Sequence, residues 1–202
     1  RRRRHASAVR RELKPSESRG VKAQLGSDIP SVLAEAVTGT HTSCMELYLV
    51  RHGLTAWNRK RVCQGQTDVP LADEGREQAR ALAARLRAIE FDAVWSSDLS
   101  RARETAEIVL EGRQLELNKT ADLREMGFGE WEGKELGPLF EQLPEERARW
   151  MNEPASWRPP GGECLGEVQE RMCRALDGLR EAHPEGRVLV LSHGFAILTY
   201  IC

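Results

Sequence analysis

The chain has 202 residues, of which 40% are hydrophobic and 30% are charged, and its formal net charge at pH 7 is −1. This length suits one globular domain, or one domain with a tail, and the near-neutral charge argues against a protein that is basic overall. No uninterrupted apolar stretch approaches the ~20 residues needed to span a bilayer, and the five cysteines never form a C-x-x-C pair, so we expect a cytoplasmic protein with no membrane contact and no disulfide framework.

The first 44 residues differ from the rest in charge. They hold seven Arg and two Lys against three Glu and one Asp, a net charge of +5, which leaves −6 for the remainder. Because they show no sustained hydrophobic period, we interpret residues 1–44 as a disordered basic extension that need not be native. The alternatives are an organelle-targeting peptide, which Glu12 and Glu17 disfavour, and an arm that binds nucleic acid or another polyanion. Met45 directly precedes the first predicted strand, so we expect the natural protein to begin there.

Strands and helices alternate from Met45 onward. The first half of this region predicts a strand over 46–51, a helix over 74–90, a strand over 93–97, a helix over 99–111 closed by Gly112, and a short strand over 115–117. The second half predicts a helical stretch over 135–153 broken at Pro138 and Pro144, a loop over 158–163, a helix over 165–182 and a strand over 187–192. This alternation predicts an α/β layered fold with a largely parallel sheet. Only eight residues follow Gly194, so we expect a domain that is incomplete at its C-terminus.

Two of the predicted strands end in the same way. LYLVRHG (47–53) and VLVLSHG (188–194) each place a His and a Gly at the carboxyl end of an apolar run. Ligands bind outside the carboxyl ends of the strands in open parallel sheets, so His52 and His193 would share one site if their strands are neighbours. A single His at a strand end is more often structural. Two in matched settings, from only five His in the chain, favour a functional role.

Further polar residues follow the predicted strands and complete a basic pocket. Asn58 comes six residues after the first His, Arg101 comes just after the strand over 93–97, and Glu125 follows the next possible strand. Arginine binds phosphate oxygens bidentately, and surrounding positive charge keeps a histidine neutral at pH 7. A neutral His could attack phosphorus to form a covalent intermediate, with Glu125 transferring the proton. We therefore expect a small phosphorylated metabolite as the partner, with no cofactor and no metal ion.

Six motifs then carry a resemblance to a known family. In chain order they are LVRHG followed by WN, QGQTDVPLADEG, SSDLSRARETA, LREMGFGEWEG, PPGGE and VLSHG. They resemble the histidine phosphatase superfamily, in the branch that also contains the cofactor-dependent phosphoglycerate mutases (branch 1). The resemblance covers residues 46 to about 200, which is essentially the whole of the chain after the basic extension. It implies a phosphoglycerate mutase-like domain there, a three-layer α/β/α sandwich that is truncated at its C-terminus.

The resemblance implies a role for each residue that matches a family motif. His52 is the phosphorylated nucleophile, Glu125 is the proton donor and acceptor, and Arg51 and His193 complete the catalytic set. The residues implied to bind the substrate are Asn58, Arg101, Thr55, Gln64, Gly65 and Gly194. Three of these, Thr55, Gln64 and Gly65, are implied to line the mouth of the site.

The short spacing between Arg101 and Glu125 and the loop WRPPGGE resemble the compact phosphatases, either alpha-ribazole phosphatases or broad-specificity phosphatases. The alternatives are a cofactor-dependent phosphoglycerate mutase and a non-catalytic module that binds phosphorylated ligands. The module is disfavoured because binding alone does not need Glu125. Nucleic acid is not an expected partner, and the oligomeric state is left open. Ala72 stands where many members carry Thr or Ser, which predicts a missing helix cap, and we expect Arg103 on the outer face of its helix.

Overall fold

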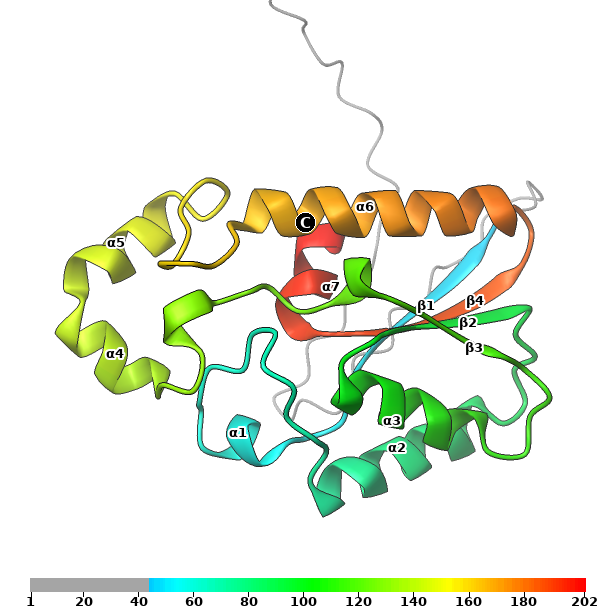
Figure 1. Cartoon of the computed structure of the whole chain (residues 1–202). Coiled ribbons are helices and arrows are strands. Elements are labelled where there is room, and N and C mark those ends of the chain that lie inside the picture. The colour runs from blue at the N-terminus through cyan, green and yellow to red at the C-terminus, as the bar shows by residue number, and fades with distance from the viewer. Residues whose placement is uncertain (1–43) are drawn as a thin grey trace, which may run out of the picture.

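The computed structural model describes residues 44–202 (Figure 1), so the prediction for residues 1–44 falls outside the described residues except at Cys44. The strands are β1 (Glu46–Arg51), β2 (Ala93–Ser97), β3 (Leu117–Thr120) and β4 (Arg187–Ser192). The α-helices are α1 (Ala56–Arg59), α2 (Asp73–Leu86), α3 (Ser100–Leu110), α4 (Leu136–Gln142), α5 (Pro144–Asn152), α6 (Leu165–Ala182) and α7 (Gly194–Ile201), and the 3-10 helices are η1 (Ala121–Leu123) and η2 (Gly129–Trp131). Within residues 44–202, no helix combines the length and apolarity needed to cross a membrane.

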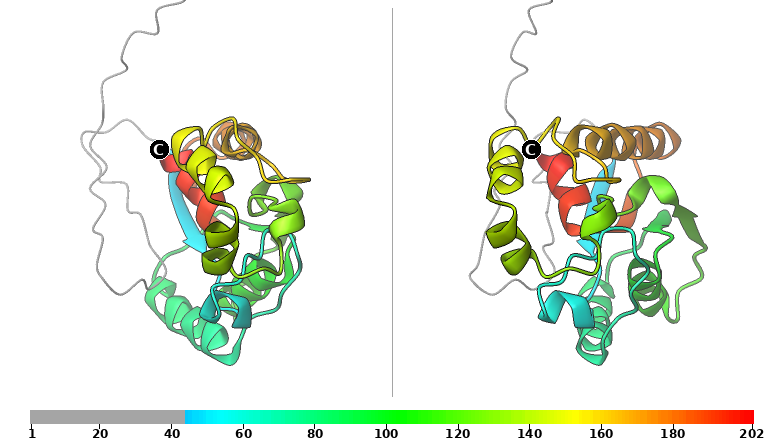
Figure 2. Two further views of the ribbon diagram at one scale, coloured as in Figure 1. Left: turned by 90° about the vertical axis from the view of Figure 1, so that its left-hand side faces the viewer. Right: turned by 60° about the vertical axis from the view of Figure 1, so that its left-hand side comes forward.

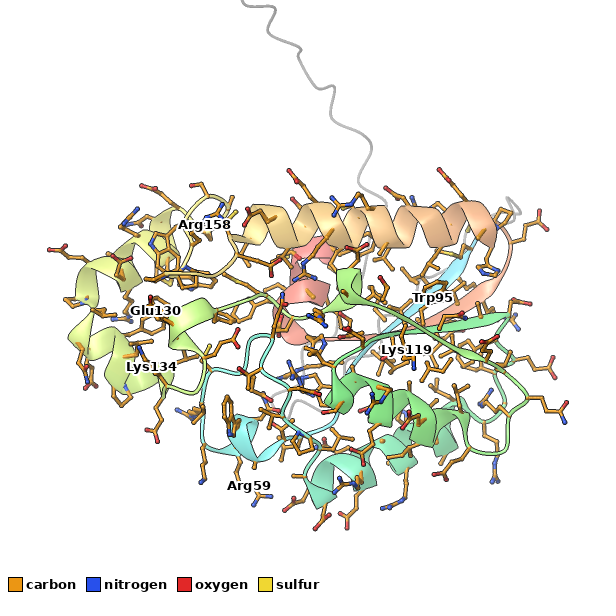
Figure 3. All side chains as sticks on the ribbon, viewed as in Figure 1. Arg59, Trp95, Lys119, Glu130, Lys134 and Arg158 are labelled. Atoms are coloured by element: carbon orange, nitrogen blue, oxygen red, sulfur yellow. The ribbon has the colours of Figure 1, made fainter. Side chains whose placement is uncertain are left out.

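Helices cover both faces of one four-stranded sheet, whose order is β1-β4-β2-β3 and whose neighbouring strands all run parallel. Successive side chains of β4 point to opposite faces. Leu189 and Leu191 pack in the core under α2 and α3, whereas Val188 and Val190 pack in the core under α6 and α7. Figure 2 shows the two helix layers on opposite sides of the sheet, and Trp95 lies between β2 and α6 in Figure 3. The predicted three-layer α/β/α sandwich is confirmed.

Most predicted elements occur where the sequence indicates them, and three differ. α2 ends at Leu86 rather than at residue 90, and the chain leaves it through a turn in which the Ile89 N–H donates to the Leu86 carbonyl oxygen at 3.0 Å. β3 covers Leu117–Thr120 rather than 115–117, because it pairs with β2 from Val94↔Leu117 to Ser97↔Thr120. Pro138 does not break a helix, because it lies in the first turn of α4, where a backbone N–H has no intrahelical partner to lose. Ala72 is the N-cap of α2 and makes no side-chain capping bond, so the predicted missing cap is confirmed.

The strand order brings the two H-G strand ends together. β1 and β4 are direct neighbours, with Arg51 opposite Ser192 in the parallel register. The ladder continues one step further, because the His52 backbone N–H donates to the Ser192 carbonyl oxygen at 3.1 Å. Both strands therefore finish at the same edge of the sheet, and α7 begins directly after His193 at that edge.

Candidate active site

His52 sits at the carboxyl end of β1 with one ring nitrogen committed to the backbone. Its side chain is buried, and Nδ1 lies 2.7 Å from the Gly53 carbonyl oxygen. Because a carbonyl only accepts, Nδ1 carries the proton, and in the neutral ring Nε2 keeps its lone pair. Burial, followed by the positive charges of Arg101 and Arg51, lowers the pKa of His52 to about 3. His52 is thus a neutral imidazole at pH 7 with a free basic nitrogen.

The backbone after His52 is held by two other elements. The Gly53 N–H donates to Thr105 Oγ1 at 3.1 Å, and this hydroxyl donates to the Arg101 carbonyl oxygen at 2.7 Å. A Cβ on Gly53 would collide with the carbonyl oxygen of Gly75 at the start of α2. Glycine at this position is therefore required by the close approach of the β1 end to α2. The sequence did not lead us to predict this role of Thr105, although a hydroxyl on the buried side of α3 was an available signal.

His193 occupies the matching position at the end of β4. Its ring centroid lies 5.0 Å from that of His52, with an interplanar angle of 56°. The residue is fully buried, and neither ring nitrogen has a hydrogen-bond partner among the described residues. Burial is the main cause that lowers the pKa of His193 well below its usual value, followed by repulsion between the protonated forms of His193 and His52 and by the charge of Arg101. Both histidines are therefore neutral at rest.

Two arginines supply the positive charge of the site. Arg101 is fully buried, and its guanidinium donates to the carbonyl oxygens of Gly65 at 2.7 Å and Thr67 at 2.9 Å. Its Nε has no hydrogen-bond partner within the part of the chain that the structure describes, and neither has the buried Nε of Arg51. Five buried side-chain nitrogen or oxygen atoms in residues 44–202 lack a partner, and four of them belong to Arg51, Arg101 and His193. Such a concentration of unsatisfied nitrogens is costly unless an anion binds there.

Glu125 reaches the same edge of the sheet from the segment between η1 and η2. Its Oε1 accepts the backbone N–H groups of Met126 at 2.9 Å, Phe195 at 3.1 Å and Ala196 at 3.1 Å. The carboxylate thereby satisfies free N–H groups in the first turn of α7, at the positive end of the helix dipole. A Cβ on Gly194 would lie 3.6 Å from Glu125 Oε2 and 3.7 Å from Arg51 Nε. Gly194 thus lies between the carboxylate and this arginine, within van der Waals distance of both.

The remaining predicted binding residues lie around α1. Thr55 caps this helix, and its hydroxyl bonds to Asn58 Oδ1 at 3.1 Å and Gln64 Oε1 at 2.8 Å. The carboxamide oxygen of Asn58 is used in the cap, so its NH₂ group is the end available to an anion. Thr55 and Gln64 are buried, and Gly65 contributes its carbonyl to Arg101. Their predicted contact with a substrate at the mouth of the site stays a prediction.

Three residues near the motifs are not part of this group. Arg103 lies on the outer face of α3, as predicted, and it pairs with Glu107 at 3.5 Å. Trp131 is buried in the core that underlies α6. Cys63 is buried as well, and burial, followed by the negative charge of Glu132, raises the pKa of its thiol to about 12. This thiol stays protonated at pH 7 and is a poor nucleophile.

Comparison with known proteins agrees with this arrangement. The family model of the histidine phosphatase superfamily (branch 1) matches residues 47–202. A relative in Cronobacter sakazakii, named "Probable phosphoglycerate mutase GpmB", is 39% identical over 153 residues, which cover 76% of this chain and 71% of the relative. The solved alpha-ribazole phosphatase from Shigella flexneri is 34% identical with a TM-score of 0.68 over 75% of each chain. A mycobacterial glucosyl-3-phosphoglycerate phosphatase is also 34% identical, with a TM-score of 0.68 over 75% of this chain and 77% of its own.

Proposed function

The chain belongs to branch 1 of the histidine phosphatase superfamily, and from this premise we propose that it hydrolyses small phosphomonoesters through a phosphohistidine on His52. One observation carries the proposal: within residues 44–202, the neutral His52 imidazole keeps Nε2 unprotonated and lies among buried donors that lack acceptors. A phosphoryl group would supply those acceptors, and its charge matches Arg51 and Arg101. We also propose that residues 45–202 form the catalytic domain. The five cysteines are all free, which supports a reducing compartment such as the cytoplasm.

In the first proposed step, the lone pair of His52 Nε2 forms a bond to phosphorus while the bond from phosphorus to the substrate oxygen breaks. Glu125, protonated for this step, gives its proton to the leaving oxygen, a role that typically contributes ~10²–10⁴-fold. The carboxylate that results is stabilised by the Phe195 and Ala196 N–H groups. Arg51, Arg101 and Asn58 bind the phosphoryl oxygens as charge develops on them.

In the second step, water attacks phosphorus on the phosphohistidine. The electron pair of the phosphorus–nitrogen bond returns to His52 Nε2, and Glu125 takes the proton that the water loses. Inorganic phosphate then departs, and the enzyme is restored. The Gly53 carbonyl holds the Nδ1 proton throughout, so the same ring nitrogen is regenerated as the nucleophile.

A mutase is the second candidate, because it uses the same first step and then passes the phosphoryl group to a hydroxyl instead of water. The name of the Cronobacter relative favours it, whereas the names of the two solved relatives favour hydrolysis. We favour hydrolysis of a metabolite in the class of ribazole phosphates or phosphoglycerate esters. A non-catalytic phosphate-binding module is disfavoured, because Glu125 lies at the same strand edge, against the first turn of α7 and near Arg51.

The experiment measures phosphate release by the full chain from a panel of phosphomonoesters that includes alpha-ribazole 5′-phosphate and glucosyl-3-phosphoglycerate. Conversion of 3-phosphoglycerate is followed in parallel, with and without 2,3-bisphosphoglycerate. We expect phosphate release that Arg101→Met abolishes and that Arg103→Met, the matched change on the exposed face of α3, leaves intact. Interconversion of phosphoglycerates without phosphate release would establish the mutase instead. Binding of phosphate without turnover of any panel member would establish the module.

A further inference from the structure

We propose that Arg171 and Glu163 form a clamp that positions Glu125 for proton transfer by holding its backbone on both sides. The inference rests on the proposed function, in which Glu125 is the acid and base. Neither residue touches the reacting atoms. Sequence reasoning assigned no role to either, and both are positioning residues.

Arg171 is a buried charge on the apolar face of α6. It lies beside Val168 and Met172, which are fully buried in the core below this helix. A lone charge here is costly unless all of its donors are satisfied. A charged residue on the apolar stripe of an amphipathic helix was the signal available in the sequence.

Each of the five N–H donors of Arg171 has an acceptor. Two donors bind Glu163, with Nε 3.0 Å from Oε1 and Nη2 3.0 Å from Oε2. The other three bind backbone carbonyls of the acid itself and of two residues just before it. Nη1 donates to the carbonyl oxygens of Asp122 at 2.9 Å and Arg124 at 2.6 Å, and Nη2 donates to that of Glu125 at 2.9 Å. One planar group therefore fixes three carbonyls.

Glu163 holds the segment from its other end. Its Oε2 accepts the Gly127 N–H at 2.7 Å, and its own backbone N–H donates to the Gly127 carbonyl at 2.8 Å. Gln66 adds a further link, because its Nε2 lies 3.2 Å from the same Oε2 and 3.3 Å from the Glu125 carbonyl. Arg171 on α6 and Glu163 just before α6 therefore hold the backbone from Asp122 to Gly127 at points before, at and after Glu125.

In this arrangement, the groups that hold the backbone of Glu125 are different from the carboxyl group that transfers the proton. The Glu125 carboxylate rests on N–H groups of α7, while its backbone is fixed from α6. Without the clamp, the carboxylate could still reach the α7 amides but no longer from one fixed backbone position. Displacement of a catalytic group by about 1 Å can cost ~10²-fold in rate. Lysine can replace Arg171 only in part, because it has three donors on a single nitrogen and no planar fork.

The test compares two substrates that differ in their need for an acid. An alkyl phosphomonoester such as glycerol phosphate needs its leaving oxygen protonated, whereas 2,4-dinitrophenyl phosphate does not. The parameter is kcat/KM, which covers the steps up to departure of the leaving group. For Arg171→Met and Glu163→Gln we expect a fall of about 10²-fold on glycerol phosphate and of less than about threefold on dinitrophenyl phosphate. Glu125→Gln should show the same selectivity, and Arg171→Lys should fall between Arg171→Met and the wild type.

Arg180→Met is the matched control, because Arg180 lies on the same helix but is exposed and pairs with Asp177 at 2.7 Å. It should leave both kcat/KM values unchanged. Equal losses on the two substrates in Arg171→Lys and Glu163→Gln would overturn the proposal, since they indicate general damage to the fold. Full activity of both variants would also overturn it. If Arg171→Met does not unfold cooperatively, it has lost the native fold, and the comparison then rests on Arg171→Lys and Glu163→Gln. A wild-type chain inactive on both substrates contradicts the proposed function itself, whereas an active wild type with unselective variants contradicts only the clamp.

Discussion

Protonation of His52 links the chemistry of the site to the pH dependence of folding. The folded protein holds this imidazole neutral with a pKa of about 3, whereas in the unfolded chain the value returns to 6.5. As the pH falls below 6.5, His52 binds a proton in the unfolded state but stays neutral in the folded state. The free energy of unfolding therefore decreases progressively as the pH falls from 6.5 toward 3.

The size of this effect follows from the two pKa values. At pH 8 both states carry a neutral His52, so it makes no difference to the free energy of unfolding. At pH 5 the unfolded state is favoured by RT ln(1 + 10^1.5), or about 2 kcal/mol, while the folded state gains almost nothing from a pKa of about 3. Replacement of His52 by asparagine removes this pH-dependent contribution to the free energy of unfolding, and the Asn amide can still donate to the Gly53 carbonyl.

The assay is urea-induced unfolding of wild type and His52→Asn at pH 8, 7, 6 and 5. We expect the variant to gain about 2 kcal/mol relative to wild type between pH 8 and pH 5, because all other titrating groups cancel in the difference. His183→Asn, at the C-terminal end of α6, controls for the loss of a histidine as such. A difference between variant and wild type that stays constant over this range would refute the reasoning. It would mean that the folded protein protonates His52 as readily as the unfolded chain does.

Three other changes test separate parts of the structure. Ala72→Ser supplies the missing cap of α2, so it should raise the free energy of unfolding by roughly 0.5–1 kcal/mol in urea without changing kcat/KM. Gly53→Ala drives a methyl group into the Gly75 carbonyl, so it should cost about 1–3 kcal/mol and abolish phosphatase activity, and a variant with wild-type stability would contradict the close approach. Overnight dialysis against a chelator should leave hydrolysis unchanged, because His52, Glu125 and the arginines carry the whole proposed mechanism. A loss that Mg²⁺ restores would contradict it.

The central part of the fold could be predicted because its strands are continuous apolar runs. Residues 46–51, 93–97 and 187–192 form strands within the predicted limits, and α6 begins and ends as its apolar period indicates. The pairing of His52 with His193 also followed from the sequence, since matched strand ends meet at one edge of a parallel sheet.

What could not be predicted depends on contacts between distant segments. The limits of β3 are set by its pairing with β2, and its own residues, LNKT, carry a weak strand pattern. Pro138 falls in the first turn of α4, and that boundary cannot be read from the proline alone. Three of the five acceptors of Arg171 are backbone carbonyls 46 to 49 residues earlier in the chain, so its role became visible only with the fold.

The most direct test of the mechanism is detection of the phosphoenzyme. The full chain is mixed with a phosphomonoester, quenched in alkali within the first turnover and digested, and the phosphorylated peptide is mapped by mass spectrometry. We expect one acid-labile phosphoryl group on His52, absent in His52→Asn and accumulating in Glu125→Gln with dinitrophenyl phosphate, where the attack of water is slowed. An enzyme that releases phosphate at full rate with no modified His52, or with the label on another residue, would contradict the account.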